Sequence, residues 1–373
     1  MKNQIQEVLG VPENLIDSAR RFYDELKKVT LQEIQPSEDD ETYEYSIKFD
    51  PPLNIGGYKT KKIKVETQMI PRDNFDKVDF VSMGVSTSTK NDTEKPYRGK
   101  INTSIKKPEF QMTLVTPEKW ELSDVSSWFD SQKSEIISSL SHEFKHLFDD
   151  QKKEFEQFGE RSRYIAGRDM PRFDIPKLDL FGHFIYYTTM IESLVRPTEI
   201  MAYLDEEKIS KRDFINFLKD NKTYKKLKEV SDLTLDDIKL DILNNMEKVH
   251  EIFDLVDIDY ENMTDSQKVD QLLDLWYDNY KRKNLNTYRR LMTTNMLEGL
   301  FGFTENKEKV FERQARIVSK FENSPMDFFR FEIKYIHKVA EEVMKKIHEL
   351  YALLPEDHFD KETNLHKKIS SRK

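Results

Sequence analysis

The sequence predicts an α+β fold, with a small antiparallel sheet packed on helices in the first part of the chain and a mostly α-helical region after it. Apolar and polar residues alternate between about residues 40 and 117, as they do in half-buried strands. From about Asp130 onward, apolar residues instead recur three or four positions apart, as on one face of a helix. The chain has 373 residues, which is enough for two or three domains.

The first predicted elements are a helix and a β-hairpin. A helix is expected over residues 11–30, because its apolar side chains fall on one face. That apolar stripe consists of Leu15, Ala19, Phe22 and Leu26. The alternating residues 43–49 and 63–69, separated by the glycine pair at 56–57, predict two antiparallel strands joined by a turn. Further strands are expected in VDFVSMGVSTST, GKINTSI and EFQMTLVT.

Helices are expected to follow the sheet. Residues 130–158 contain no glycine or proline, and Asp130 is the expected N-cap of a helix there. Two more helical segments lie on either side of Pro197. One amphipathic helix is expected over residues 238–256, where apolar residues mark a single face.

The longest predicted helix starts at Pro325, a residue suited to a first turn, and ends before Pro355. These patterns divide the chain into residues 1–206, which carry the sheet and the candidate site, and a helical domain of residues 207–373. Within the first part, the N-terminal helix and the sheet occupy 1–120 and the helices of the site occupy 121–206.

The composition limits the chemistry that the chain can perform. It has no cysteine, so thiol nucleophiles, disulfides and thiolate metal sites are excluded, and any metal must be held by His, Asp or Glu. The net charge of −9 does not suggest a nucleic-acid-binding protein. Neither a signal peptide nor an apolar run of membrane-spanning length is evident, so no membrane partner is expected. A cytoplasmic location is expected, or a virion if the protein is phage-encoded.

The stretch ISSLSHEFKHLFDD contains His142 and His146, with Glu143 directly after the first histidine. On a helix, residues four apart lie on the same face, so both imidazoles can point at one ion. Glu143 lies about 100° round the helix from His142, where it can reach a water bound to that ion. With 8 histidines in the chain, the pattern is expected by chance in about one or two such chains per hundred. Its helical context therefore favours a metal site.

This arrangement of residues is typical of a zinc-dependent peptidase. Zinc lowers the pKa of its bound water towards about 7, and a carboxylate beside it takes the proton as the water attacks a carbonyl. Glu143 is the expected general base in that reaction.

A catalytic zinc site needs a third protein ligand. Glu199, in the segment RPTEIMAYL, is the first choice, because Pro197 starts a new helix and places Glu199 in its first turn. Glu192 is the rival, since one continuous helix through Pro197 would put the two glutamates on the same face. If the helix breaks at Pro197, Glu192 is expected to be a solvated acid or to hydrogen-bond a metal ligand from outside the coordination sphere. Asp169 is a weaker rival.

The segment SHEFKHLFDD followed by RPTEIMAYL resembles the gluzincin-like zinc metallopeptidases, in the H-E-x-x-H…P-x-E-x-x-A form found among phage-encoded proteins. The resemblance covers about residues 130–206. It implies a zincin-type helical pair, with His142, His146 and Glu199 as zinc ligands and Glu143 as the catalytic base.

The chain departs from related patterns at several positions. Asp149 and Lys152 stand where a metzincin has its glycine and third histidine. Many gluzincins carry an aspartate four residues after the third ligand, where it orients a ligand histidine, and this chain has Tyr203 there. Asp205, Asp149 or Asp150 is expected to supply that outer contact instead.

Zincins also need a group that stabilises the oxyanion of the tetrahedral intermediate. His183 and Tyr203 are the first choices, and Tyr186, Tyr187 and Arg196 are the others near the third-ligand helix. The peptide substrate is expected to lie extended along a sheet edge, with EFQMTLVT as the expected strand.

A second hypothesis treats the chain as a structural or interaction protein, such as a phage virion component, in which the zincin fold is a scaffold. The helical residues 207–373 carry no motif of their own, and they would provide the contacts to virion partners or to further copies of the chain. Glu143 favours the enzyme, because a purely structural site has no use for a general base.

Overall fold

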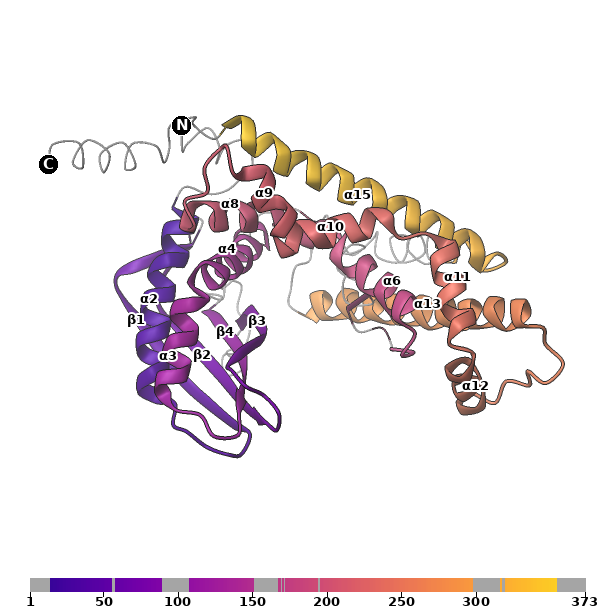
Figure 1. Cartoon of the computed structure of the whole chain (residues 1–373), viewed down its shortest axis with the longest axis horizontal. Coiled ribbons are helices and arrows are strands. Elements are labelled where there is room, and N and C mark those ends of the chain that lie inside the picture. The colour runs from indigo at the N-terminus through magenta and orange to yellow at the C-terminus, as the bar shows by residue number, and fades with distance from the viewer. Residues whose placement is uncertain are drawn as a thin grey trace, which may run out of the picture. The chain divides into compact units, whose positions relative to one another are not determined.

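The computed structural model describes residues 14–55, 58–88, 107–150, 167–168, 170, 172–193, 195–297, 316 and 319–353 (Figure 1). Helix α2, Leu15–Glu33, confirms the helix expected near the N-terminus. Leu15, Ala19, Phe22 and Leu26 are each fully buried, as their spacing predicts. In the described ranges, no helix has both the length and the apolar character needed to cross a membrane.

Four strands form one sheet in the order β1-β2-β4-β3. Their bounds are Glu41–Ile55 for β1, Tyr58–Arg72 for β2, Asp79–Ser88 for β3 and Lys107–Pro117 for β4. The hairpin of β1 and β2 is confirmed, with Ile47 opposite Ile63 in an antiparallel register. The prediction that the whole sheet is antiparallel is wrong, because β2 and β4 run parallel. The strand expected in GKINTSI lies outside the described residues.

One face of the sheet is covered by helices and the other is polar. Alternate residues of β1 and β4 are buried, among them Ile47, Phe49 and Leu114, while their neighbours remain partly or fully exposed. Helix α2 packs on β1, and helix α4 packs on β3 (Figure 1). This α+β arrangement confirms the predicted fold class at that level.

Two helices lead from the sheet into the candidate site. Helix α3 spans Leu122–Ser131 and α4 spans Lys133–Asp150, with a break at Gln132. The prediction of Asp130 as an N-cap is therefore wrong, because Asp130 lies within α3. Its exposed carboxylate accepts a hydrogen bond from Nζ of Lys27 at 2.5 Å.

The remaining helices follow in chain order. Their bounds are Pro176–Tyr187 for α6, Met190–Ser193 for α7, Arg196–Glu206 for α8, Phe214–Asp220 for α9, Lys222–Asp232 for α10, Leu235–Asn244 for α11, Met246–Leu255 for α12, Asp265–Leu297 for α13 and Pro325–Leu353 for α15. The long helix from Pro325 is confirmed. The single helix expected over 238–256 is wrong, because the backbone breaks at Asn245 and leaves two helices.

The chain forms two compact units. The first contains Met1–Lys152, Pro197–Phe214 and Glu349–Lys373, and the second contains Lys153–Arg196 and Ile215–His348. The first unit is built on the sheet. The second is helical and packs around Phe181, Trp276 and Phe329, whose ring centroids lie 5.0 to 5.4 Å apart. The helical region expected from residue 207 thus contributes most of the second unit, together with residues 153–196.

The ring of Phe22 links the sheet to helix α4. It lies 5.1 Å from Phe110 on β4 and 5.7 Å from Phe144 on α4, between ring centroids, and is fully buried. Phe22→Ala is expected to lower the free energy of unfolding by about 3–5 kcal/mol, because it leaves a cavity in the core. Urea denaturation measures this loss. Replacing the exposed Leu122 with alanine is the control, and a similar small loss in both variants would contradict this view of the core.

Candidate metal centre

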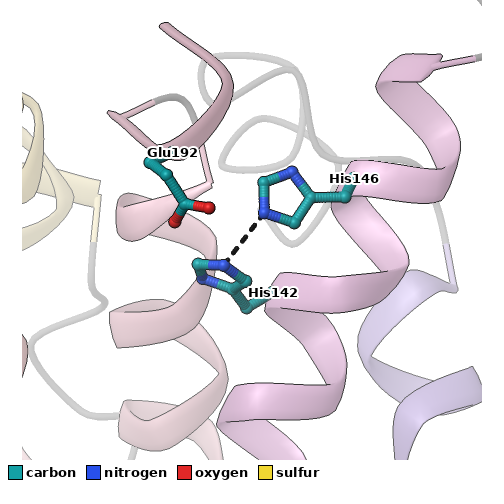
Figure 2. Close-up of side chains that lie close together, drawn as sticks. All are labelled: His142, His146 and Glu192. Carbon is teal, nitrogen blue, oxygen red and sulfur yellow. Dashed lines mark hydrogen bonds between the residues drawn. The ribbon is translucent and has the colours of Figure 1, made fainter. Parts of the chain in front are cut away.

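His142 and His146 come together on one face of helix α4, as their spacing predicts. Their Nε2 atoms lie 3.0 Å apart, and the rings are nearly perpendicular, at 80° (Figure 2). Two Zn–N bonds of about 2.0–2.1 Å at a tetrahedral angle would place the nitrogens about 3.3 Å apart. The observed pair is close to that separation, so the two imidazoles are near enough to bind one metal ion.

The opposite face of α4 anchors the helix in the core. Phe144 is 1% exposed and packs on Phe22, and Ile137 and Leu140 are fully buried. Because Phe144 is two residues from each histidine, its side chain leaves the helix on the side opposite to theirs. The packing therefore sets the rotation of α4 that presents both histidines together.

Glu199 lies behind His142. Its carboxylate Oε2 is 3.2 Å from Nδ1 of His142, the ring nitrogen that does not face His146. The hydroxyl of Ser138 donates to the backbone carbonyl of Glu199 at 2.9 Å, which holds the first turn of α8 against α4. A carboxylate at Nδ1 fixes the tautomer that keeps the proton there and leaves Nε2 as an electron-pair donor.

Glu192 instead shares the space in front of the two histidines. One ligand atom from each of His142, His146 and Glu192 lies within 4.8 Å of the others, and Figure 2 shows the carboxylate turned towards the rings. Glu192 is 1% exposed. A break separates α7 from α8 and Glu199 lies in the first turn of α8, as expected. The carboxylate of Glu199 contacts Nδ1 of His142, whereas the carboxylate of Glu192 is grouped with both histidines.

The direction of α8 places Tyr203 away from the histidines. Glu199 contacts His142, whereas Glu207, just past the end of α8, accepts a hydrogen bond from Ser134 at the start of α4. The two helices therefore run antiparallel. Burial, and then the negative charges of Glu135 and Glu207, raise the pKa of Tyr203. Tyr203 thus lies towards the first turns of α4.

His183 lies on α6, in a group of aromatic and cationic side chains. Its ring centroid is 5.8 Å from that of Tyr186 and 5.9 Å from that of Tyr187. Burial of the ring, followed by the positive charges of Lys226 and Arg196, lowers the pKa of His183 to about 4, although the residue keeps exposed surface. His183 is therefore neutral near pH 7.

The remaining predicted residues have other places. Glu143 is half-buried on α4. Asp205 forms an ion pair with Arg20 of α2, so it is not the partner of a ligand histidine. The side chains of Asp149, Asp150 and Asp169 lie outside the described part of the chain.

The carboxylate of Glu192 is held by two side chains. Nη2 of Arg196, at the start of α8, lies 2.6 Å from Oε2 of Glu192 on α7. The hydroxyl of Tyr186 donates to the other oxygen, Oε1, at 3.0 Å. The four-residue spacing of Glu192 and Arg196 is compatible with this pair, but no local pattern in the sequence shows that the carboxylate is buried.

Comparison of the chain with protein-family models, with curated proteins and with solved structures finds no match.

Proposed function

We propose that the protein is a zinc-dependent peptidase in which His142, His146 and Glu192 hold the metal. The observation that carries this proposal is the pair of Nε2 atoms 3.0 Å apart, with the far side of His142 held by Glu199. In zinc sites, the second ring nitrogen of a ligand histidine commonly donates a hydrogen bond to a carboxylate, which orients the ring. The antiparallel pair of α4 and α8 supports a zincin-type site.

Glu143 is the general base in this proposal. When bound, zinc supplies Lewis acidity and lowers the pKa of a water that it holds to about 7. Glu143 follows His142 directly, so its carboxylate is beside the ligand face of α4 without sharing it. It accepts the proton of the attacking water and passes it to the leaving amine.

The substrate in this proposal is an extended peptide bound along β3. The expected strand EFQMTLVT is not available, because β4 is paired on both sides, with β2 and with β3. Strand β3 forms one edge of the sheet among the described strands, and α4 packs on it. An edge strand offers backbone hydrogen bonds to a peptide with few demands on its side chains.

Metal analysis of the purified protein tests the proposal. One zinc per chain is expected, together with hydrolysis of a peptide library that stops on chelation and returns with zinc. His146→Ala is expected to lose both, because only two protein ligands remain. His250→Ala is the matched control, since that histidine lies on α12, where its ring stacks on Tyr260.

Two results would count against this function. Full zinc content in His146→Ala would show that the histidine pair is not the metal site. Zinc binding without hydrolysis of any peptide would favour the scaffold hypothesis.

A further inference from the structure

We propose that Tyr186 and Arg196 are positioning residues that hold Glu192 in the orientation needed to bind the metal. This inference rests on the proposed function, because it assigns these two residues to a ligand of that site. Neither residue touches the substrate in this proposal. They act through the carboxylate of Glu192.

The ligand glutamate lies on a short element that provides little support of its own. Helix α7 has only four residues, Met190–Ser193, and one turn of helix does not form a stable structure alone. Both histidines, by contrast, lie on the 18-residue helix α4, which is anchored in the core. A glutamate side chain also has three rotatable bonds, so its orientation must come from its partners.

Two side chains provide that orientation by holding different oxygens. The hydroxyl of Tyr186 donates to Oε1 at 3.0 Å, and Nη2 of Arg196 donates to Oε2 at 2.6 Å. A carboxylate oxygen has two acceptor sites, so an oxygen that accepts one hydrogen bond can also bind a metal. The two bonds fix the plane of the carboxylate.

Arg196 is itself held in place. Its guanidinium carbon lies 4.1 Å from the centroid of the Tyr187 ring, and its side chain is 12% exposed. A cation stacked on an aromatic face is stabilised there, and a buried pair of this kind has few alternative arrangements. The ring of Tyr187 therefore supports the arginine, while the neighbouring Tyr186 contacts the glutamate directly.

An ordinary helix ion pair would explain Arg196 alone, because residues four apart often pair on helix surfaces. Three features distinguish the arrangement here. The Glu192 side chain is 2% exposed, a second donor meets its other oxygen, and the same carboxylate lies near both histidines. An exposed pair needs none of these, whereas carboxylates that bind a metal are commonly held by hydrogen bonds from outer partners.

The experiment measures zinc affinity by competition with a calibrated chelator. Tyr186→Phe is expected to weaken zinc binding about 10-fold, and Arg196→Gln about 10–100-fold, the range for partners of metal ligands. Arg196→Lys is expected to recover part of the loss, because it restores the charge but not the planar donor. Absorption of the cobalt-substituted protein should change in the same variants, since the geometry of the ligand changes.

Tyr187→Phe is the matched control. It removes the same hydroxyl from the next residue, where that group donates to the backbone carbonyl of Thr223 at 3.4 Å, and it keeps a ring under Arg196. Zinc affinity is expected to remain within about twofold of the unaltered chain in this variant, because the described hydrogen bond of the removed hydroxyl goes to Thr223. A loss as large as that of Tyr186→Phe would point to general destabilisation and overturn the proposal.

A double-mutant cycle separates positioning from a structural role. In a Glu192→Ala background, Tyr186→Phe should cause no further loss of zinc affinity, because the carboxylate that it positions is gone. An equal loss in both backgrounds would overturn the inference.

The inference and the proposed function can fail separately. If His146→Ala loses zinc while Tyr186→Phe and Arg196→Gln bind it normally, only this inference fails. If His146→Ala keeps its zinc, both the proposed function and this inference fail.

Discussion

Glu143→Gln is expected to keep one zinc per chain and the folded structure, and to lower the rate of peptide hydrolysis by about 10²–10⁴-fold. The amide has nearly the shape of the carboxylate but cannot accept the proton of the attacking water. The side chain is not among the three grouped metal-binding residues, so the metal should remain. Steady-state hydrolysis of a peptide substrate, with zinc content measured on the same sample, gives the comparison.

Glu135→Gln is the control for that variant. Glu135 is also half-buried on α4, but it lies near Tyr203, about two turns before His142. Its replacement is expected to leave the rate within about twofold, as for a surface charge away from the reacting atoms. If Glu143→Gln retains the activity of the unaltered chain, Glu143 is not the base.

Glu192→Ala is expected to lower zinc affinity by orders of magnitude, whereas Glu199→Ala should lower it by only about 10–100-fold. The first removes the proposed carboxylate ligand and leaves two histidines. The second removes the acceptor at Nδ1 of His142 and leaves all three ligands in place. Competition of each variant with a chelator of known affinity ranks them directly. If Glu199→Ala is the more damaging variant, Glu199 is the ligand, as the sequence alone suggested.

The local parts of the fold were predictable because their signals are local. Alternation of apolar residues marked β1 and β2, and the stripe from Leu15 to Leu26 marked α2. The parallel pairing of β2 with β4 was not predictable, since strand direction depends on a connection that crosses the sheet. The break at Asn245 was also missed, because apolar spacing continues through it while the backbone does not.

The site, like the fold, was predictable only where its residues lie close together in the sequence. The spacing of His142 and His146 on one helix brings their nitrogens together whatever the rest of the fold does. The break before α8 was also predictable from Pro197. The sequence could not show that α8 runs antiparallel to α4 and directs Glu199 at the back of an imidazole. The choice between the two glutamates depends on that direction, which no local pattern encodes.

The two residues between Glu143 and His146 limit which sequences can form this centre. A five-letter H-E-x-x-H pattern allows any residue at both positions, yet Phe144 is 1% exposed and Lys145 is 5% exposed. A smaller residue at 144 would leave a void beside Phe22, and a larger one would displace the helix that carries the histidines. Sequences compatible with this centre are therefore far fewer than the motif implies, because one of its unspecified letters also belongs to the core.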